Sequence, residues 1–149
     1  MERLLILNPG STSTKLAVYD DETPVYTESI VHTPEELAPF DCVADQYAFR
    51  RDLVLRSLEQ HRIPLNSLTA IVSRGGLLPP IEAGAYRINE DMVWQLRNRP
   101  RNEHASNVGA MIAYDIANRL EIPAFIYDGV TVDELTPINK ITGLPSMQR

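Results

Sequence analysis

The sequence is poor in the features that mark several protein classes. One cysteine, Cys42, stands among 149 residues, so no disulfide can form within the chain. No apolar run approaches the ~20 residues that a membrane-spanning helix needs. Fourteen basic residues against twenty acidic ones give a net charge of −6, a poor match for nucleic acid or an anionic membrane. We therefore expect neither a disulfide-stabilised scaffold nor a nucleic-acid or membrane partner.

The N-terminus also lacks the pattern of a secretory signal. A strand pattern begins at Leu4, without the charged segment and long apolar segment of a signal peptide. Hydrophobic residues make up 44% of the chain. A domain of this length buries roughly 70% of the surface that its unfolded chain exposes. These features predict one cytoplasmic domain spanning residues 1–149.

The hydrophobic pattern predicts strands and helices in the order β-β-β-α-β-α-α-β. This order indicates an α/β fold with a mixed sheet, in which a three-stranded meander is joined to parallel strands and helices lie on the faces. The expected elements are strands at 4–7, 15–20 and 25–32, a short helix after Thr33, a helix at 43–61, a strand at 70–72, helices after Asn89 and at 102–120, and a strand at 123–127.

Two of these elements carry expectations about burial. The continuous apolar run from Leu4 to Leu7 is typical of a central strand covered on both faces. In the helix expected at 43–61, Val54 and Leu58 belong to the apolar stripe, whereas Arg50 falls on the solvent-facing side.

The connection between the first two strands, Asn8 to Lys15, is longer and more polar than a hairpin turn requires. Gly10 lets the backbone approach an anion closely, and Ser11 and Ser13 supply hydroxyl donors beside consecutive backbone N–H groups. Lys15 can add a positive charge. The segment predicts a phosphate-binding loop, with a plain polar turn as the alternative. It has neither the P-loop spacing nor the dinucleotide-binding fingerprint.

Further candidate residues follow later strands, where ligands bind in α/β sheets. Arg74, beside Gly75 and Gly76, offers a bidentate fork for a carboxylate or phosphate, and a solvated arginine at a glycine turn is the alternative. Asp128 could hold Mg²⁺ through water, although a turn-forming aspartate fits the spacing equally well. His104 lies at a helix N-terminus, a natural anion site, and is otherwise a surface or capping residue.

Together these segments resemble the acetate/butyrate kinase family of the sugar kinase, Hsp70 and actin superfamily. Pro9, and Ser73-Arg74 in place of the Val-His typical of acetate kinases, favour the butyrate or branched-chain members. The resemblance covers essentially the whole chain. The segments that carry it are ILNPGSTSTKLAVYDDE, DQYAFRRDLVL, AIVSRGGLLPPI, EHASNVGAMIA, IPAFIYDGVTVDEL and ITGLP.

The resemblance implies a ribonuclease-H-like domain and transfer of the γ-phosphoryl group of ATP to a short-chain carboxylate, with Mg²⁺ as cofactor. Butyrate is the expected acceptor, and acetate, propionate or a branched-chain acid are alternatives. A non-catalytic phosphate- or nucleotide-binding fragment is the alternative of another class. The full-length family member is expected to be a homo-oligomer.

The resemblance also implies roles for individual residues. It matches Asp128 to the aspartate that acts through Mg²⁺, and His104 and Asn107 to a stretch lining the active-site cleft. Arg74 stands three residues after the position of the family's substrate-binding arginine, held here by Ile71, and is expected to take over that role. The residues implied to lie near the transferring phosphate are Asn8, Ser11, Ser13 and Lys15.

Members of the family carry two such domains and are more than twice as long. The resemblance therefore implies that residues 1–149 are an N-terminal domain, and that the adenosine site and a further catalytic histidine belong to a second domain absent from this chain. We expect the chain alone to be an inactive kinase.

Overall fold

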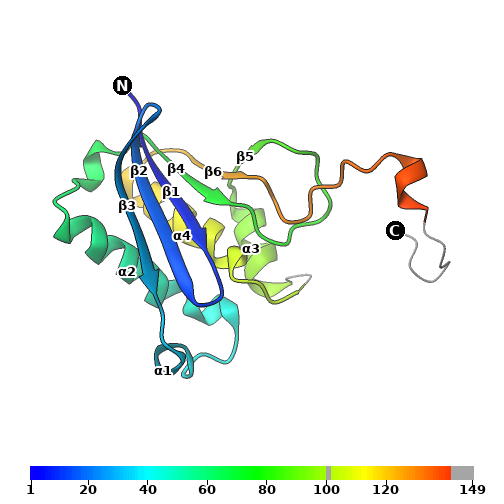
Figure 1. Ribbon diagram of the computed structural model, residues 1–149, viewed down its shortest axis with the longest axis horizontal. Helices are drawn as coiled ribbons and strands as arrows, with labels where there is room; N and C mark the ends of the chain where they lie inside the picture. Colours follow the sequence, from blue (N-terminus) through cyan, green and yellow to red (C-terminus); the bar gives the residue numbers. More distant parts are fainter. Residues whose placement is uncertain (100–101, 142–149) are drawn as a thin grey trace.

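The computed structural model describes residues 1–99 and 102–141, which form a six-stranded mixed sheet with helices packed against it (Figure 1). The mixed sheet confirms the predicted fold class. Its strands, in the spatial order β3-β2-β1-β4-β6-β5, are β1 (Arg3–Pro9), β2 (Ser13–Asp20), β3 (Thr23–Val31), β4 (Ala70–Arg74), β5 (Ala85–Arg87) and β6 (Ala124–Tyr127). The helices are α1 (Pro34–Leu37), α2 (Tyr47–Gln60), α3 (Glu90–Asn98) and α4 (Ser106–Leu120), with 3₁₀ helices η1 (Val43–Gln46), η2 (Leu65–Ser67) and η3 (Pro137–Lys140).

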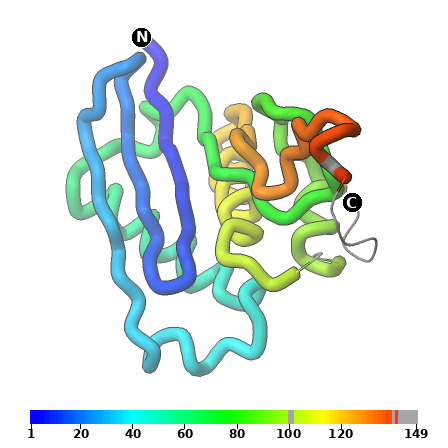
Figure 2. Tube along the Cα trace, turned by 45° about the vertical axis from the view of Figure 1, so that its right-hand side comes forward, coloured from blue at the N-terminus to red at the C-terminus, as the bar shows by residue number. Residues whose placement is uncertain are grey.

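Both predicted pairing directions are present in the sheet. Strands β1, β2 and β3 form an antiparallel meander, whereas β4 pairs in parallel with β1, and β6 in parallel with β4. The carboxyl ends of β1, β4 and β6 therefore meet at one edge of the sheet. Figure 2 shows the meander on one side, and the segments after β4 and β6 running side by side, where Ile81 and Val132 form an isolated bridge.

The core lies between one face of the sheet and the helices. Leu5, Leu7 and Ile71 are fully buried, helix α4 contacts β1, β4 and β6, and both α2 and α3 pack against α4. Burial alternates along β1, so Leu4 and Ile6 on the opposite face are only half-buried. The expectation that this strand is covered on both faces is therefore wrong for the described residues, because the helices that contact the sheet lie on the other face.

Two helix caps confirm the predicted helix starts. The Thr33 N–H donates to Glu36 Oε2 at 2.8 Å, and the Glu36 N–H donates to Thr33 Oγ1 at 3.3 Å, which makes a capping box. Asn89 Oδ1 accepts a hydrogen bond from the Met92 N–H at 2.8 Å. Strand β5 was not predicted, because its three residues are too few to show an alternating pattern.

Helix α4 lies close against the strand ends because it has a glycine in its first turns. A Cβ atom on Gly109 would lie 2.2 Å from Ser73 Oγ and 3.1 Å from Pro9 Cδ. Pro9 ends β1, and Ser73 comes one residue before the end of β4. The glycine therefore allows the beginning of α4 to reach the edge where the parallel strands end. Every helix within the described ranges is too short or too polar to cross a membrane.

Candidate functional site

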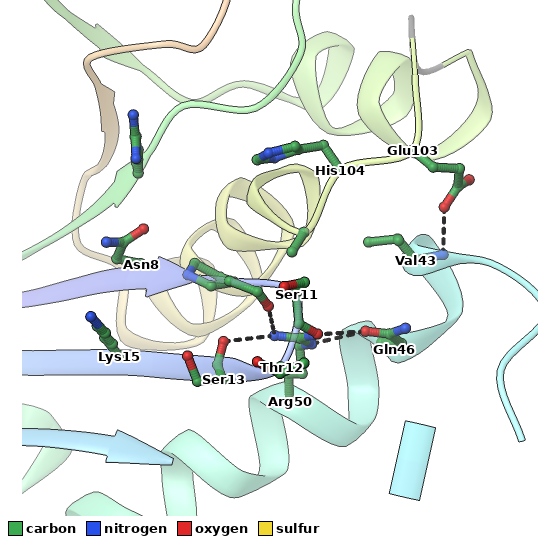
Figure 3. A pocket seen from close by; sticks show the side chains of 14 residues that line it. Asn8, Ser11, Thr12, Ser13, Lys15, Val43, Gln46, Arg50, Glu103 and His104 are labelled. Atoms are coloured by element: carbon green, nitrogen blue, oxygen red, sulfur yellow. Dashed lines mark hydrogen bonds between the residues drawn. The ribbon is translucent and has the colours of Figure 1, made fainter. Parts of the chain in front are cut away.

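A cavity of about 510 Å³ lies at this edge, between the tip of the β1–β2 hairpin, the start of α2 and the segment before α4 (Figure 3). Cavities of this size hold small-molecule ligands in other proteins. The hairpin contributes Asn8, Pro9, Gly10, Ser11, Thr12, Ser13 and Lys15. The other segments contribute Val43, Gln46, Arg50, Arg74, Glu103, His104 and Ala105.

The hairpin connection is shorter than the sequence predicted. Strand β1 continues to Pro9 and β2 begins at Ser13, so residues 10–12 connect the two strands. The Gly10 N–H donates to the Ser13 carbonyl oxygen at 2.7 Å and closes the turn. Thr14 lies in the part of β2 that precedes its apolar pattern; although polar, it is fully buried and its hydroxyl oxygen is hydrogen-bonded.

Arg50 lies beneath this tip and is fully buried, so the prediction that it faces solvent is wrong. Its Nη1 donates to the carbonyl oxygens of Gly10 and Ser13 at 2.8 and 3.1 Å, and its Nη2 donates to that of Ser11 at 3.1 Å. Gln46 Oε1 accepts from Nε and Nη2 at 3.0 and 2.8 Å. The hairpin folds over the first turns of α2, and its carbonyl groups replace the water that an exposed arginine would bind (Figure 3). Burial lowers the pKa of Arg50 from its ordinary value.

A second buried group, His32, is connected to Arg50 through Thr14. Arg50 Nη1 donates to Thr14 Oγ1 at 3.1 Å, so the Thr14 hydroxyl is available to donate to His32 Nε2, 2.8 Å away. This assignment puts the proton of a neutral His32 on Nδ1, which has no hydrogen-bond partner among the described residues. Burial, and then the charge of Arg50, lower the pKa of His32.

Most of the residues predicted to form the site share this one cavity. The hairpin residues are joined there by Arg74 at the end of β4 and by His104 before α4. They lie at the edge where the carboxyl ends of β1 and β4 meet, which is where α/β sheets bind ligands in general. The predicted residues that line the cavity are Asn8, Gly10, Ser11, Ser13, Lys15, Arg74 and His104.

Gly75, Gly76 and Asn107 do not line the cavity and instead hold neighbouring segments together. A Cβ on Gly75 would lie 2.7 Å from Gly129 Cα, and one on Gly76 would lie 2.8 Å from Asn107 Oδ1. Asn107 is buried, and its Oδ1 accepts from the Leu77 N–H at 2.9 Å. These residues therefore fix how the segment after β4 meets α4.

Asp128 also lies outside the lining of the cavity. It is exposed and follows Tyr127, which stands opposite Arg74 in the parallel register of β4 and β6. Its φ of 53° is left-handed, a conformation that aspartate tolerates in turns. Among the described residues, no group of three His, Cys, Asp or Glu side chains is arranged to hold a metal ion. Of the segment ITGLP that contributes to the resemblance, residues 142–145 lie outside the described residues.

His104 is oriented by the first turn of α4. Its Nδ1 accepts from the Ser106 N–H at 3.2 Å and lies 2.7 Å from Ser106 Oγ. In the neutral ring the proton therefore resides on Nε2, which leaves a donor available at the cavity wall. The first N–H groups of α4 already have partners: those of Ser106 and Asn107 donate to Nδ1 and the carbonyl oxygen of His104. The helix therefore contributes the positive potential of its dipole here, not free donors.

A hydrogen bond that joins two walls of the cavity was not predicted from the sequence. Glu103 Oε2 accepts from the Val43 N–H at 2.7 Å and ties the segment before α4 to the start of η1 (Figure 3). The two residues are sixty positions apart in the sequence. No local pattern could have revealed this contact.

The charges around the cavity favour an anion, in contrast to the net charge of the chain. Lys15, Arg50 and Arg74 line it, against a single carboxylate, Glu103, among the lining residues. Hydroxyl groups add hydrogen-bond donors, and the N-terminus of α4 adds positive potential. An anion with several oxygen atoms, such as a phosphate, can accept from many of these donors together.

No protein-family model matches the chain. Its fold is similar to that of acetate kinase from Porphyromonas gingivalis, with a TM-score of 0.58 and 11% identity over 97% of this chain and 42% of that chain. It is also similar to acetate kinase from Entamoeba histolytica, with a TM-score of 0.56 and 12% identity over 97% and 41% of the two chains. These likenesses show the fold. The chain spans about two-fifths of the length of these two kinases.

Proposed function

We propose that this chain is the N-terminal domain of an ATP-dependent kinase that phosphorylates a short-chain carboxylate, with butyrate as the acceptor. The observation that carries the proposal is the convergence of Ser13, Lys15 and Arg74 on one cavity at the strand ends of an acidic chain. The fold shared with two acetate kinases supports the same reaction class.

Phosphoryl transfer to a carboxylate requires that the two reactants be positioned and that the negative charge of the phosphate groups be neutralised. An oxygen of the acceptor carboxylate attacks the γ-phosphorus of ATP, the bond to the β–γ bridging oxygen breaks, and ADP leaves with that electron pair. The carboxylate is already ionised, so no general base is needed. Lys15 and the hairpin donors are suited to hold phosphoryl oxygens, and the Arg74 fork is suited to orient the carboxylate.

The residues present fit a magnesium–nucleotide complex at the edge of the cavity. Mg²⁺ is usually held by one or two carboxylates, water and substrate phosphates, and so needs no cage of protein ligands. We propose that the carboxylate of Asp128 holds this ion. Asp128 directly follows β6, whose last residue pairs with Arg74 at the end of β4. When bound, the ion would supply positive charge to the phosphate oxygens.

Butyrate as the preferred acceptor rests on the sequence resemblance. Leu77 and Leu78 follow Arg74 closely, but Leu78 is part of the core. Initial rates with butyrate, acetate and propionate in a protein containing both domains would rank the acceptors. A preference for acetate would retain the reaction class and reject the butyrate assignment.

Phosphate binding by the hairpin can be tested on this chain directly. Calorimetry with inorganic phosphate and with Mg·ATP should detect binding, and Ser13→Ala should weaken it by about 10- to 100-fold, the typical effect of losing a hydrogen bond to a charged group. Ser29→Ala is the matched control, since Ser29 lies opposite Lys15 on β3 and outside this cavity. Equal binding by all three proteins would remove the hairpin from the site.

Turnover separates the kinase from the alternative, a non-catalytic phosphate- or nucleotide-binding fragment. Trapping of acyl phosphate with hydroxylamine reports the proposed product. A two-domain protein that contains this chain, binds Mg·ATP and forms no acyl phosphate from any short-chain acid would favour the binding fragment.

A further inference from the structure

Arg50 is a buried cation that has no acidic partner in the described part of the chain. Its side chain is fully buried, and each acceptor that it contacts is neutral: carbonyl oxygens, a threonine hydroxyl and a glutamine amide oxygen. Within residues 1–99 and 102–141 no carboxylate forms an ion pair with it. The next residue, Arg51, instead pairs with Asp52 and Asp115. An unpaired buried charge is costly, so its presence calls for a compensating anion.

The contacts of Arg50 also determine which backbone groups of the hairpin tip remain available. The guanidinium holds the carbonyl oxygens of Gly10, Ser11 and Ser13. The N–H groups of Ser11 and Thr12 donate to no other described residue, and both residues line the cavity. Successive N–H groups held in this way are a common means of binding an anion. One side chain therefore fixes the carbonyl groups and leaves the donors for a ligand.

We propose that Arg50 is a positioning residue of the anion site: it fixes the hairpin tip from beneath and supplies the buried positive charge that a bound phosphate group balances. The inference rests on the proposed phosphate-binding function and extends it to a residue without solvent exposure. A phosphate ligand would contact the hairpin donors, and the charge of Arg50 would act through the tip. Because Arg50 is shielded from solvent ions, salt should screen its contribution less than that of an exposed lysine.

The test is calorimetric titration of the full chain with inorganic phosphate. Arg50→Gln removes the charge and part of the fork, and is expected to weaken phosphate binding at least tenfold. Arg50→Lys keeps the charge with a different donor geometry, and should fall between Arg50→Gln and the wild type. The control for charge is Arg56→Gln on the exposed side of α2, expected within twofold of the wild type.

A second control separates positioning from loss of stability. Val54→Ala creates a cavity in the buried face of the same helix without changing charge, and should lower the thermal midpoint while leaving phosphate affinity within twofold. If Arg50→Gln does not fold, Arg50→Lys is compared with Val54→Ala. Weaker binding in Arg50→Lys than in Val54→Ala would support the inference, and equal binding would overturn it.

The possible failures can be told apart. Phosphate binding by the wild type, together with undiminished binding by Arg50→Gln, would overturn this inference and leave the proposed function standing. Equal losses in Arg50→Gln and Arg50→Lys would overturn the role of the charge. No phosphate binding by the wild type would overturn both the inference and the hairpin site on which it rests.

Discussion

The close approach of α4 to the strand ends predicts an unusual response to the substitution Gly109→Ala. Glycine inside a helix costs about 1 kcal/mol relative to alanine, so the substitution would stabilise the protein if space allowed it. Here the new Cβ would lie 2.2 Å from Ser73 Oγ and 3.1 Å from Pro9 Cδ. The serine hydroxyl or the helix must therefore move.

Overpacking and helix propensity act in opposite directions on the free energy of unfolding, and their difference gives the expected effect of Gly109→Ala. Overpacking a close-packed site costs typically 1–3 kcal/mol, against a helix-propensity gain of about 1 kcal/mol. We expect Gly109→Ala to lower the free energy of unfolding by about 1 kcal/mol, the difference between these terms. Ser73→Ala removes the nearest clashing atom, so Gly109→Ala in that background should be neutral or stabilising. The double-mutant cycle should show a coupling of about 1–2 kcal/mol.

Urea unfolding of the four proteins, followed by circular dichroism, measures the cycle. Additive effects of the two substitutions would refute the close contact between Gly109 and Ser73. The same cycle bears on the site, because Ser73 precedes Arg74 and Pro9 follows Asn8. Phosphate binding should weaken in Gly109→Ala and recover when Ser73→Ala is added, since the helix then has room for the new methyl group.

Three other predictions concern single sites and the isolated chain. In a two-domain kinase, Arg74→Lys should impair kcat/KM nearly as much as Arg74→Ala, because the charge remains but the fork is lost; near-normal rates for the lysine variant would refute bidentate recognition. Burial, and then the charge of Arg50, hold the pKa of His32 below its ordinary value of 6.5, so the unfolded chain binds a proton first as pH falls. The free energy of unfolding should therefore decrease below about pH 6.5, by at most about 1.4 kcal/mol per pH unit, until folded His32 also titrates. His32→Gln should flatten this slope in urea titrations, and an unchanged slope would refute its assignment to His32. Finally, residues 1–149 alone should form no acyl phosphate in the hydroxylamine assay, because one wall of a cleft cannot hold both reactants in line; sustained turnover by the purified chain would show that one domain suffices.

Much of the fold could be predicted because its signals are local. The meander follows from short alternating segments joined by polar turns, and the caps at Thr33 and Asn89 follow from residue types next to each helix. The joint location of the hairpin and Arg74 was also predictable. It follows from a general property of parallel strands, whose carboxyl ends share one edge.

The roles of Arg50 and His32 were not predictable, because their environments come from distant parts of the chain. Arg50 contacts Gly10 across forty positions, and His32 meets Thr14 across eighteen. An arginine in a helical pattern is assigned to the solvent side because it is charged. The pattern contains no information on carbonyl groups of a distant hairpin that could bind it. The apolar run of β1 was misleading for a related reason: it indicates a buried strand without indicating how many faces are covered.

The position of the cavity follows from the sheet and from the helix that crosses it. Strands β1 and β4 bring the hairpin tip and Arg74 to one edge, and α4 runs back along them, so its N-terminus reaches the same edge. Each element therefore adds donors or positive potential at one place, within a chain whose net charge is −6. A negative net charge does not attract an anion from a distance, so we expect its capture to depend on short-range hydrogen bonds and on the cations at the cavity. Arg50 meets that requirement better than an exposed cation, because the hairpin that it holds is also the surface that a phosphate would contact.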